Sequence, residues 1–196
     1  MKVQVASRWI LGMAVGSLAV LMAMTLGVTS VHGQAQHIRW DIVSIASGSP
    51  APGGHASAFA NDGSRITLTG GGTFVAPGGG DGTSGAVTGG GMWAVFPSGA
   101  TTPSATGNYV VTGLVRWEEK GTFPALPDRA VGGLVALRIE YSDGSHGVLF
   151  VSCHAPSGSD PSVFEGITAS KSFTDYWRRE APVGGVDADR TLFHVE

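Results

Sequence analysis

The stretch LVALRIEYSDGSHGVLFV, residues 134–151, decides the fold of this chain. In its first half apolar residues alternate with Arg138 and Glu140, which is the two-residue period of a half-buried strand. Asp143-Gly144 follows, a pair that supplies the positive φ angles of a tight hairpin. The stretch therefore predicts two neighbouring antiparallel strands. Residues 148–151 are apolar at consecutive positions, so we expect the second strand to be covered on both faces.

Short alternating runs of the same kind recur along the chain, separated by Gly, Pro, Asp and Asn, with a second tight turn at Asn61-Asp62-Gly63. No interval between them is long enough for the helical crossover that parallel strands require. We predict an all-β domain, a single antiparallel β-barrel of about eight to ten strands, with a β-sandwich as the alternative. The expected strands are residues 38–46, 56–60, 64–69, 73–76, 86–96, 109–119, 134–141, 148–153, 163–168 and 191–195.

Two glycine runs interrupt these strands in similar surroundings, Thr69-Gly70-Gly71-Gly72-Thr73-Phe74 and Thr88-Gly89-Gly90-Gly91-Met92-Trp93. Glycine weakens a strand, so it is expected where a strand bends sharply, as in the closure of a small barrel. The alternative is that the glycines let a ligand or another backbone come close. Sharp bends favour the barrel over the sandwich.

Residues 1–33 have the pattern of a secretory signal peptide. The segment begins with two basic residues, continues with the uncharged residues 9–28, and ends in small residues at the spacing that a signal peptidase accepts. We predict cleavage before Gln34, with cleavage before Gln36 as an alternative, and a secreted, periplasmic or other extracytoplasmic protein. The other possibility is that residues 9–28 remain as a membrane anchor, because they are long enough to span a bilayer.

Residues 34–196 fit one domain of acidic character. The chain has 12 Lys and Arg against 15 Asp and Glu, and removal of the two basic residues of the leader leaves ten against 15. Only Arg178-Arg179 is a basic cluster, so no nucleic-acid-binding surface is expected. Cys153 is the single cysteine, which precludes an intramolecular disulfide. We expect its thiol to be buried; the alternative is an exposed thiol available for dimerisation or chemistry.

One segment beyond the leader predicts a helix. Ser172-Phe173-Thr174-Asp175 resembles a capping box, Phe173, Tyr176 and Trp177 fall on one helical face, and Pro182 ends the segment. We expect a short helix over residues 172–181 whose aromatic side chains pack against the sheet or close an end of the barrel. Alternatively, these side chains form the aromatic wall of a binding site.

The motifs of nucleotide, metal and nucleophilic sites are absent or incomplete. Residues 80–85 have G-x-G-x-x-G spacing but lead into a strand instead of a helix. The histidines lack metal-site spacing, and Asp187-Ala188-Asp189 lacks the rest of a calcium loop, so no metal and no cofactor is predicted. Cys153-His154 could act together only if a strand ended between them. Catalytic residues are therefore left unassigned.

Three segments of the C-terminal half together resemble an uncharacterised group of secreted bacterial β-rich proteins. They are residues 151–154, 162–180 and 187–195, and the resemblance would extend over most of the mature chain. The resemblance implies export and a single domain, and it gives no indication of an activity.

These observations favour a non-enzymatic module that binds a small, partly apolar ligand in the mouth of the barrel. The candidate binding residues are Trp93, Trp117, Tyr176, Trp177 and Glu165, with a place in the core as the alternative for each aromatic residue. A glutamate facing inward with a raised pKa would also suit an enzyme. The second hypothesis is thus an extracytoplasmic cyclase or isomerase, by analogy of architecture with allene oxide cyclase and dirigent proteins. The third is a structural envelope or surface protein.

Overall fold

The computed structural model describes residues 35–46, 48–76, 85–126, 129–155, 159–160, 163–182 and 188–196. Within these residues the regular structure is entirely β, and all strands join one sheet with antiparallel pairing. The all-β prediction is confirmed. The strands are β1 (Gln36–Ala46), β2 (Ser49–Pro52), β3 (His55–Phe59), β4 (Arg65–Thr69), β5 (Gly71–Ala76), β6 (Val87–Phe96), β7 (Ala105–Thr122), β8 (Ala130–Tyr141), β9 (His146–Cys153), β10 (Gly166–Lys171), β11 (Thr174–Tyr176), β12 (Arg178–Arg179) and β13 (Arg190–Val195).

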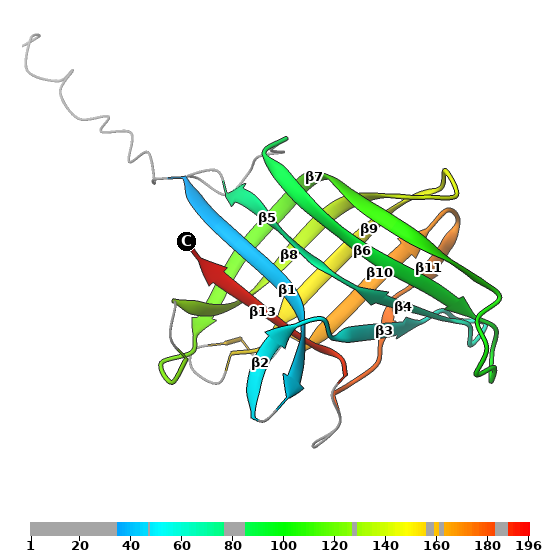
Figure 1. The fold of residues 1–196 in the computed structure, drawn as a ribbon, viewed down its shortest axis with the longest axis horizontal. Helices are drawn as coiled ribbons and strands as arrows, with labels where there is room; N and C mark the ends of the chain where they lie inside the picture. Colours follow the sequence, from blue (N-terminus) through cyan, green and yellow to red (C-terminus); the bar gives the residue numbers. More distant parts are fainter. Residues whose placement is uncertain are drawn as a thin grey trace, which may run out of the picture. The chain divides into compact units, whose positions relative to one another are not determined.

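Six of these strands close into a barrel in the order β1, β5, β6, β7, β8 and β13, with β13 returning to β1 (Figure 1). The chain forms the predicted barrel and not the sandwich, but the closed ring has fewer strands than expected. The other strands extend the sheet from the ring. β4, β3 and β12 continue from β6, β9, β10 and β11 continue from β8, and β2 pairs with the end of β1.

Both predicted tight turns join neighbouring strands. The turn around Asp62-Gly63 connects β3 to β4, and the turn around Asp143-Gly144 connects β8 to β9. Gly63 and Gly144 have φ angles of 82° and 83°, the conformation for which glycine was expected. Because each turn is encoded by adjacent residues, the sequence sufficed to predict it.

The two glycine runs meet where the sheet branches. The first half of β6 pairs with β5 and its second half pairs with β4, and Gly71 lies opposite Gly90 at the branch. Gly89 has a φ of 129°, so the strand is bent there. A Cβ at Gly91 would lie far inside van der Waals distance of the Thr69 carbonyl oxygen. The glycines therefore serve both as bends and as points of close approach between backbones.

The interior of the six-stranded ring is a packed core. Ile38, Trp40 and Ile42 point inward from β1 and are fully buried. The Phe193 ring lies 4.7 Å from the Trp117 ring, measured between centroids, and belongs to the same cluster. The side chains of the ring thus fill its centre, as in other small barrels.

Residues 172–181 do not form the predicted helix. Ser172, with a φ of 54°, and Phe173 make a turn between β10 and β11, where Ala169 pairs with Tyr176. Tyr176 is buried whereas Trp177 is exposed, so the aromatic residues follow the two-residue period of a strand. Residues 173, 176 and 177 have the spacing of a helical face, but Phe173 lies in the turn, so the three aromatic residues do not belong to one continuous element.

Several sequence predictions concern residues outside the described part of the chain. These are the leader with the cleavage point before Gln34, most of the glycine loop at 80–85, and Asp187. In the part that the structure describes, no helix is long and apolar enough to cross a membrane.

Candidate ligand-binding site

The outer face of β1 and β13 carries a group of polar side chains over a buried apolar surface. These strands pair directly, with Arg39 opposite His194 and Asp41 opposite Leu192. Alternate residues of both strands point into the barrel, so these four side chains point outward together. Two segments far apart in the sequence thereby form one surface.

A hollow of about 230 Å³ lies on this surface. The edge strand β2, which pairs with the end of β1, forms one side of it, and the turn ending at Leu126 forms another. The two prolines of β2 occur on an edge strand, where a missing N–H is tolerated. The apolar wall consists of Val43, Pro50, Ala51, Pro52, Leu126 and Leu192.

The other end of the hollow is ionic. Arg39 Nε donates to Asp41 Oδ2 at 3.1 Å, and Arg39 Nη1 lies 3.9 Å from Glu196 Oε1. The Asp41 side chain is only 12% exposed, whereas that of Arg39 is 42% exposed. The carboxylate is therefore largely covered, and the guanidinium reaches from it into the solvent at the rim.

A second hollow, of about 250 Å³, shares Arg39 and His194 with the first and is also lined by Arg129 and Glu196. His194 Nδ1 is buried and has no hydrogen-bond partner among the described residues. Arg129 has a φ of 50°, an uncommon conformation for a residue other than glycine. The two hollows together offer an apolar wall beside a mixed ionic group.

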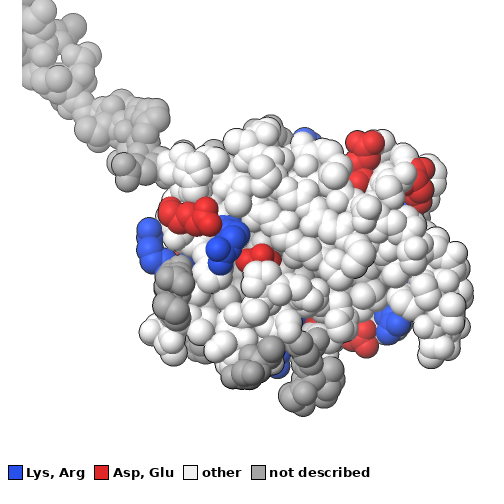
Figure 2. All heavy atoms as spheres, in the orientation of Figure 1, with Lys and Arg blue, Asp and Glu red and all other residues white. Residues whose placement is uncertain are grey.

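The surface charge agrees with this arrangement. On the face shown in Figure 2, uncharged atoms predominate, and basic and acidic side chains lie side by side in the region where Figure 1 places β1 and β13. No group of His, Cys, Asp and Glu within the described ranges is arranged to hold a metal ion.

A third hollow, of about 510 Å³, lies over β4, β6 and β7. Its walls include Met92, which is exposed, and three threonines. Trp93 reaches it beneath Gly107, where a Cβ would collide with the indole. The walls hold no charged side chain, so this hollow has less to orient a ligand than the first two.

Two of the five predicted binding residues, Trp93 and Tyr176, lie near Tyr141 on the inner side of the sheet. The Trp93 and Tyr141 rings meet edge to face at 5.8 Å, and burial, followed by the nearby Tyr176, raises the pKa of Tyr141. Both are buried, and Trp93 Nε1 donates to the Asn108 carbonyl oxygen at 3.1 Å. These contacts place the two side chains in the core beside a polar network.

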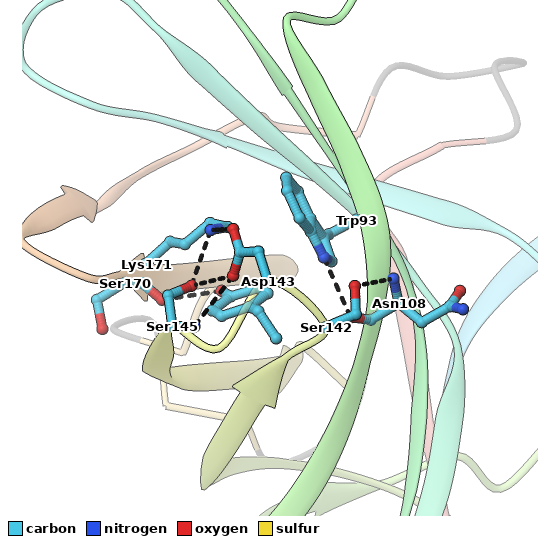
Figure 3. A network of polar contacts seen from close by, with 8 residues as sticks. Trp93, Asn108, Ser142, Asp143, Ser145, Ser170 and Lys171 are labelled. Atoms are coloured by element: carbon cyan, nitrogen blue, oxygen red, sulfur yellow. Dashed lines mark hydrogen bonds and ion pairs between the residues drawn. The ribbon is translucent and has the colours of Figure 1, made fainter.

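Lys171 is the centre of that network (Figure 3). Its ammonium group binds Asp143 and donates to Ser145 Oγ at 2.8 Å, and it lies 4.4 Å from the centre of the Trp93 ring. These contacts link the β8–β9 turn to the end of β10. The Lys171 side chain is only 13% exposed, so its ammonium group is largely covered by the protein.

Trp117 and Trp177 lie elsewhere. Trp117 is partly buried and packs against Phe74 and Phe193 inside the ring. Trp177 is 53% exposed and contacts Phe150 on the outside of the sheet, with ring centroids 5.5 Å apart. The contact covers part of β9, whose consecutive apolar residues predicted cover on both faces. The predicted aromatic residues thus do not converge on one pocket.

Glu165, the fifth predicted residue, joins the end of β9 to the start of β13. Its carboxylate accepts hydrogen bonds from the backbone N–H groups of Thr191 at 2.7 Å and His154 at 2.8 Å. Burial raises its pKa to about 7 against the opposing effect of these hydrogen bonds. Burial, and next the Glu165 carboxylate, raise the pKa of the nearby Cys153 thiol.

The expectation that Cys153 is buried is confirmed. β9 does end at Cys153, which was the condition for the thiol and His154 to act together. However, the His154 imidazole is engaged elsewhere, with Nδ1 2.9 Å from the Val163 carbonyl oxygen.

Sequence reasoning did not find Arg39, Asp41 or His194 as site residues. The only available signal was their alternation with apolar residues in strands, which many surface residues share. Comparison with models of protein families, with curated proteins and with solved structures found no match.

Proposed function

We propose that this protein binds a small, partly apolar molecule in the hollow between β2 and the outer face of β1 and β13. The observation that carries the proposal is the joining of an apolar wall to an ionic group within one depression. Binding sites for small molecules commonly combine apolar lining with a few polar groups that fix orientation. This location replaces the barrel mouth, because the centre of the ring is filled by its own side chains.

A blocking substitution tests the location. Ala51 is exposed on β2 and lines the hollow, so the indole of Ala51→Trp should occupy it. Ala105→Trp is the matched control, since Ala105 is exposed at the start of another strand and lines none of the three hollows. Small amphipathic molecules are screened by the shift that they cause in the melting temperature of the protein.

The proposal requires that hits stabilise the wild type and the Ala105→Trp variant and fail to stabilise Ala51→Trp. Equal stabilisation of all three proteins would place binding elsewhere. A screen without hits would remove the support for a binding function.

A second candidate function is acid–base chemistry at Glu165, as a cyclase or isomerase requires. It is favoured by a carboxyl group with a pKa of about 7 beside a thiol. It ranks second because Glu165 lines none of the three hollows described above. The test is deuterium incorporation at carbon into small carbonyl compounds in heavy water. Catalysis that is lost in Glu165→Gln supports the candidate, and no catalysis by the wild type rejects it.

A further inference from the structure

The ligand class can be inferred from the geometry of Arg39. A guanidinium group has five N–H donors in a planar fork, and its two terminal nitrogens can hold both oxygens of a carboxylate. Asp41 binds Nε, and Glu196 stays 3.9 Å from Nη1, beyond hydrogen-bond distance. Among the described residues, no group makes a hydrogen bond to either terminal nitrogen.

Asp41 fixes the direction in which this fork points. The Asp41 side chain is largely covered, and it accepts a hydrogen bond from Nε of Arg39, two positions earlier on the same strand. The terminal nitrogens are thereby held at the rim instead of sweeping through the solvent. An arginine oriented in this way loses less conformational freedom when it binds an anion.

The surroundings complete a site for an acid. His194 lies opposite Arg39 on β13, its Nδ1 has no hydrogen-bond partner in the described part of the chain, and Arg129 lines the adjoining hollow. The apolar wall around Leu192 begins beside the same guanidinium. A molecule with a short apolar body and a terminal carboxylate would meet both parts at once.

We infer that the natural ligand is a small organic acid, held by its carboxylate on the free edge of Arg39 and by its apolar body against Leu192 and Leu126. This inference rests on the proposed binding function. Asp41 acts as a positioning residue. Glu196 is a competitor, since its carboxylate lies 3.9 Å from Nη1, one of the two nitrogens that the ligand carboxylate would bind.

The experiment is a titration followed by nuclear magnetic resonance, with short-chain and aryl-substituted carboxylates as probes and the primary amide of each as its neutral counterpart. We expect each carboxylate to bind at least about tenfold more tightly than its amide, the range for a hydrogen bond to a charged group. Arg39→Gln should abolish this preference, and Arg39→Lys should retain part of it, because lysine keeps the charge but lacks the fork.

Glu196→Gln should change affinity in the opposite direction. Removal of the competing carboxylate should tighten binding of the acids about two- to fivefold and leave the amides unaffected. Arg178→Gln, which removes an exposed arginine on β12, is the control and should change nothing. Circular dichroism verifies that each variant is folded.

The outcomes separate this inference from the proposed function. Equal binding of acids and amides to the wild type, blocked in both cases by Ala51→Trp, would overturn the inference and leave the binding site intact. Binding of neither class would overturn both. A preference for acids that survives Arg39→Gln would also overturn the inference, because another cation would then hold the carboxylate.

Discussion

Two regions of the molecule pair a cation with an aspartate in opposite ways. In the closed pair, Lys171 binds Asp143 and Ser145 and lies beneath the Trp93 ring. In the open pair, Arg39 binds Asp41 through one nitrogen and presents the rest of its guanidinium beside a hollow. The Lys171 side chain is 13% exposed and that of Arg39 is 42% exposed.

The difference shows how the same chemistry can be structural in one place and available in another. The closed pair satisfies its ammonium group within the protein and covers it with aromatic rings, so its contribution is to stability. In the open pair, the terminal nitrogens of Arg39 have no hydrogen-bond partner among the described residues, and they lie at the edge of an apolar wall. Substitutions in the closed pair should therefore reduce stability, and substitutions in the open pair should chiefly change binding.

The largest loss of stability should come from Trp93→Ala, which removes the ring that covers the closed pair. The substitution removes a buried indole that packs against Tyr141, and it opens a cavity above Lys171. We expect a loss of about 3–5 kcal/mol in the free energy of unfolding, measured by urea denaturation. Trp93→Phe should lose less, because a ring remains. A loss below about 1 kcal/mol would show that the cover is not an integral part of the core.

Glu165 extends the comparison to a third carboxyl group, which is held mainly by backbone N–H groups. Its folded pKa of about 7 lies above its ordinary value of 4.5, so the folded protein binds the proton more tightly than the unfolded chain. The stabilisation is complete below pH 4.5 and is lost as the pH rises through about 7. We expect the wild type to lose about 1–3 kcal/mol of stability over this window.

Glu165→Gln removes this dependence. An amide cannot accept both backbone hydrogen bonds, so the variant should be less stable at every pH, but its stability should not contain the change centred on Glu165. The measurement is the difference in unfolding free energy between wild type and variant as a function of pH. A constant difference would mean that the pKa of Glu165 is not raised in the folded protein.

The local sequence predicted the turns and bent strands around the two ion pairs, but it did not predict the ion pairs themselves. The Asp143-Gly144 turn follows from adjacent residues, and the glycine runs correctly indicated a barrel with bent strands. The helix predicted after Ser172 is wrong, because the aromatic spacing of this segment fits a turn followed by a strand as well as a helix. Tertiary pairing decides between the two, and a single sequence does not contain that information locally.

The open pair could not be predicted from the sequence for a related reason. Arg39 and His194 become neighbours only through the pairing of the first and last strands of the ring. Their residue types are common on exposed faces of strands, and no short motif accompanies them. Three of the four aromatic residues predicted to bind a ligand, Trp93, Trp117 and Tyr176, instead belong to the core or pack against it.

Lys171→Met tests the closed pair directly. The methionine keeps much of the apolar stem but loses the ion pair and the hydrogen bond to Ser145, so we expect a loss of about 1 kcal/mol, because Asp143 is half-exposed and solvent screens the pair. Lys171, followed by Ser145, lowers the pKa of Asp143 from 3.8 to about 2. The contribution of the pair is therefore present above pH 3.8 and is lost as the pH falls through about 2.

The pH dependence is the diagnostic measurement. The difference in unfolding free energy between the wild type and Lys171→Met should be constant near neutral pH and should narrow in acid. A difference that stays constant into strong acid would assign the effect to packing of the side chain and not to the ion pair.

Glu196→Gln in the open pair should have the smallest effect on stability. Its carboxylate is half-exposed, and its 3.9 Å separation from Arg39 Nη1 is too long for a hydrogen bond. Exposed pairs of this kind contribute little, so the free energy of unfolding should change by less than about 0.5 kcal/mol. The matched substitution in the closed pair, Ser145→Ala, removes hydrogen bonds to Lys171 and Asp143 and should cost about 1 kcal/mol. If the two losses were equal, Glu196 would hold Arg39 as firmly as Ser145 holds Lys171, and the guanidinium would not have a free edge to offer a ligand.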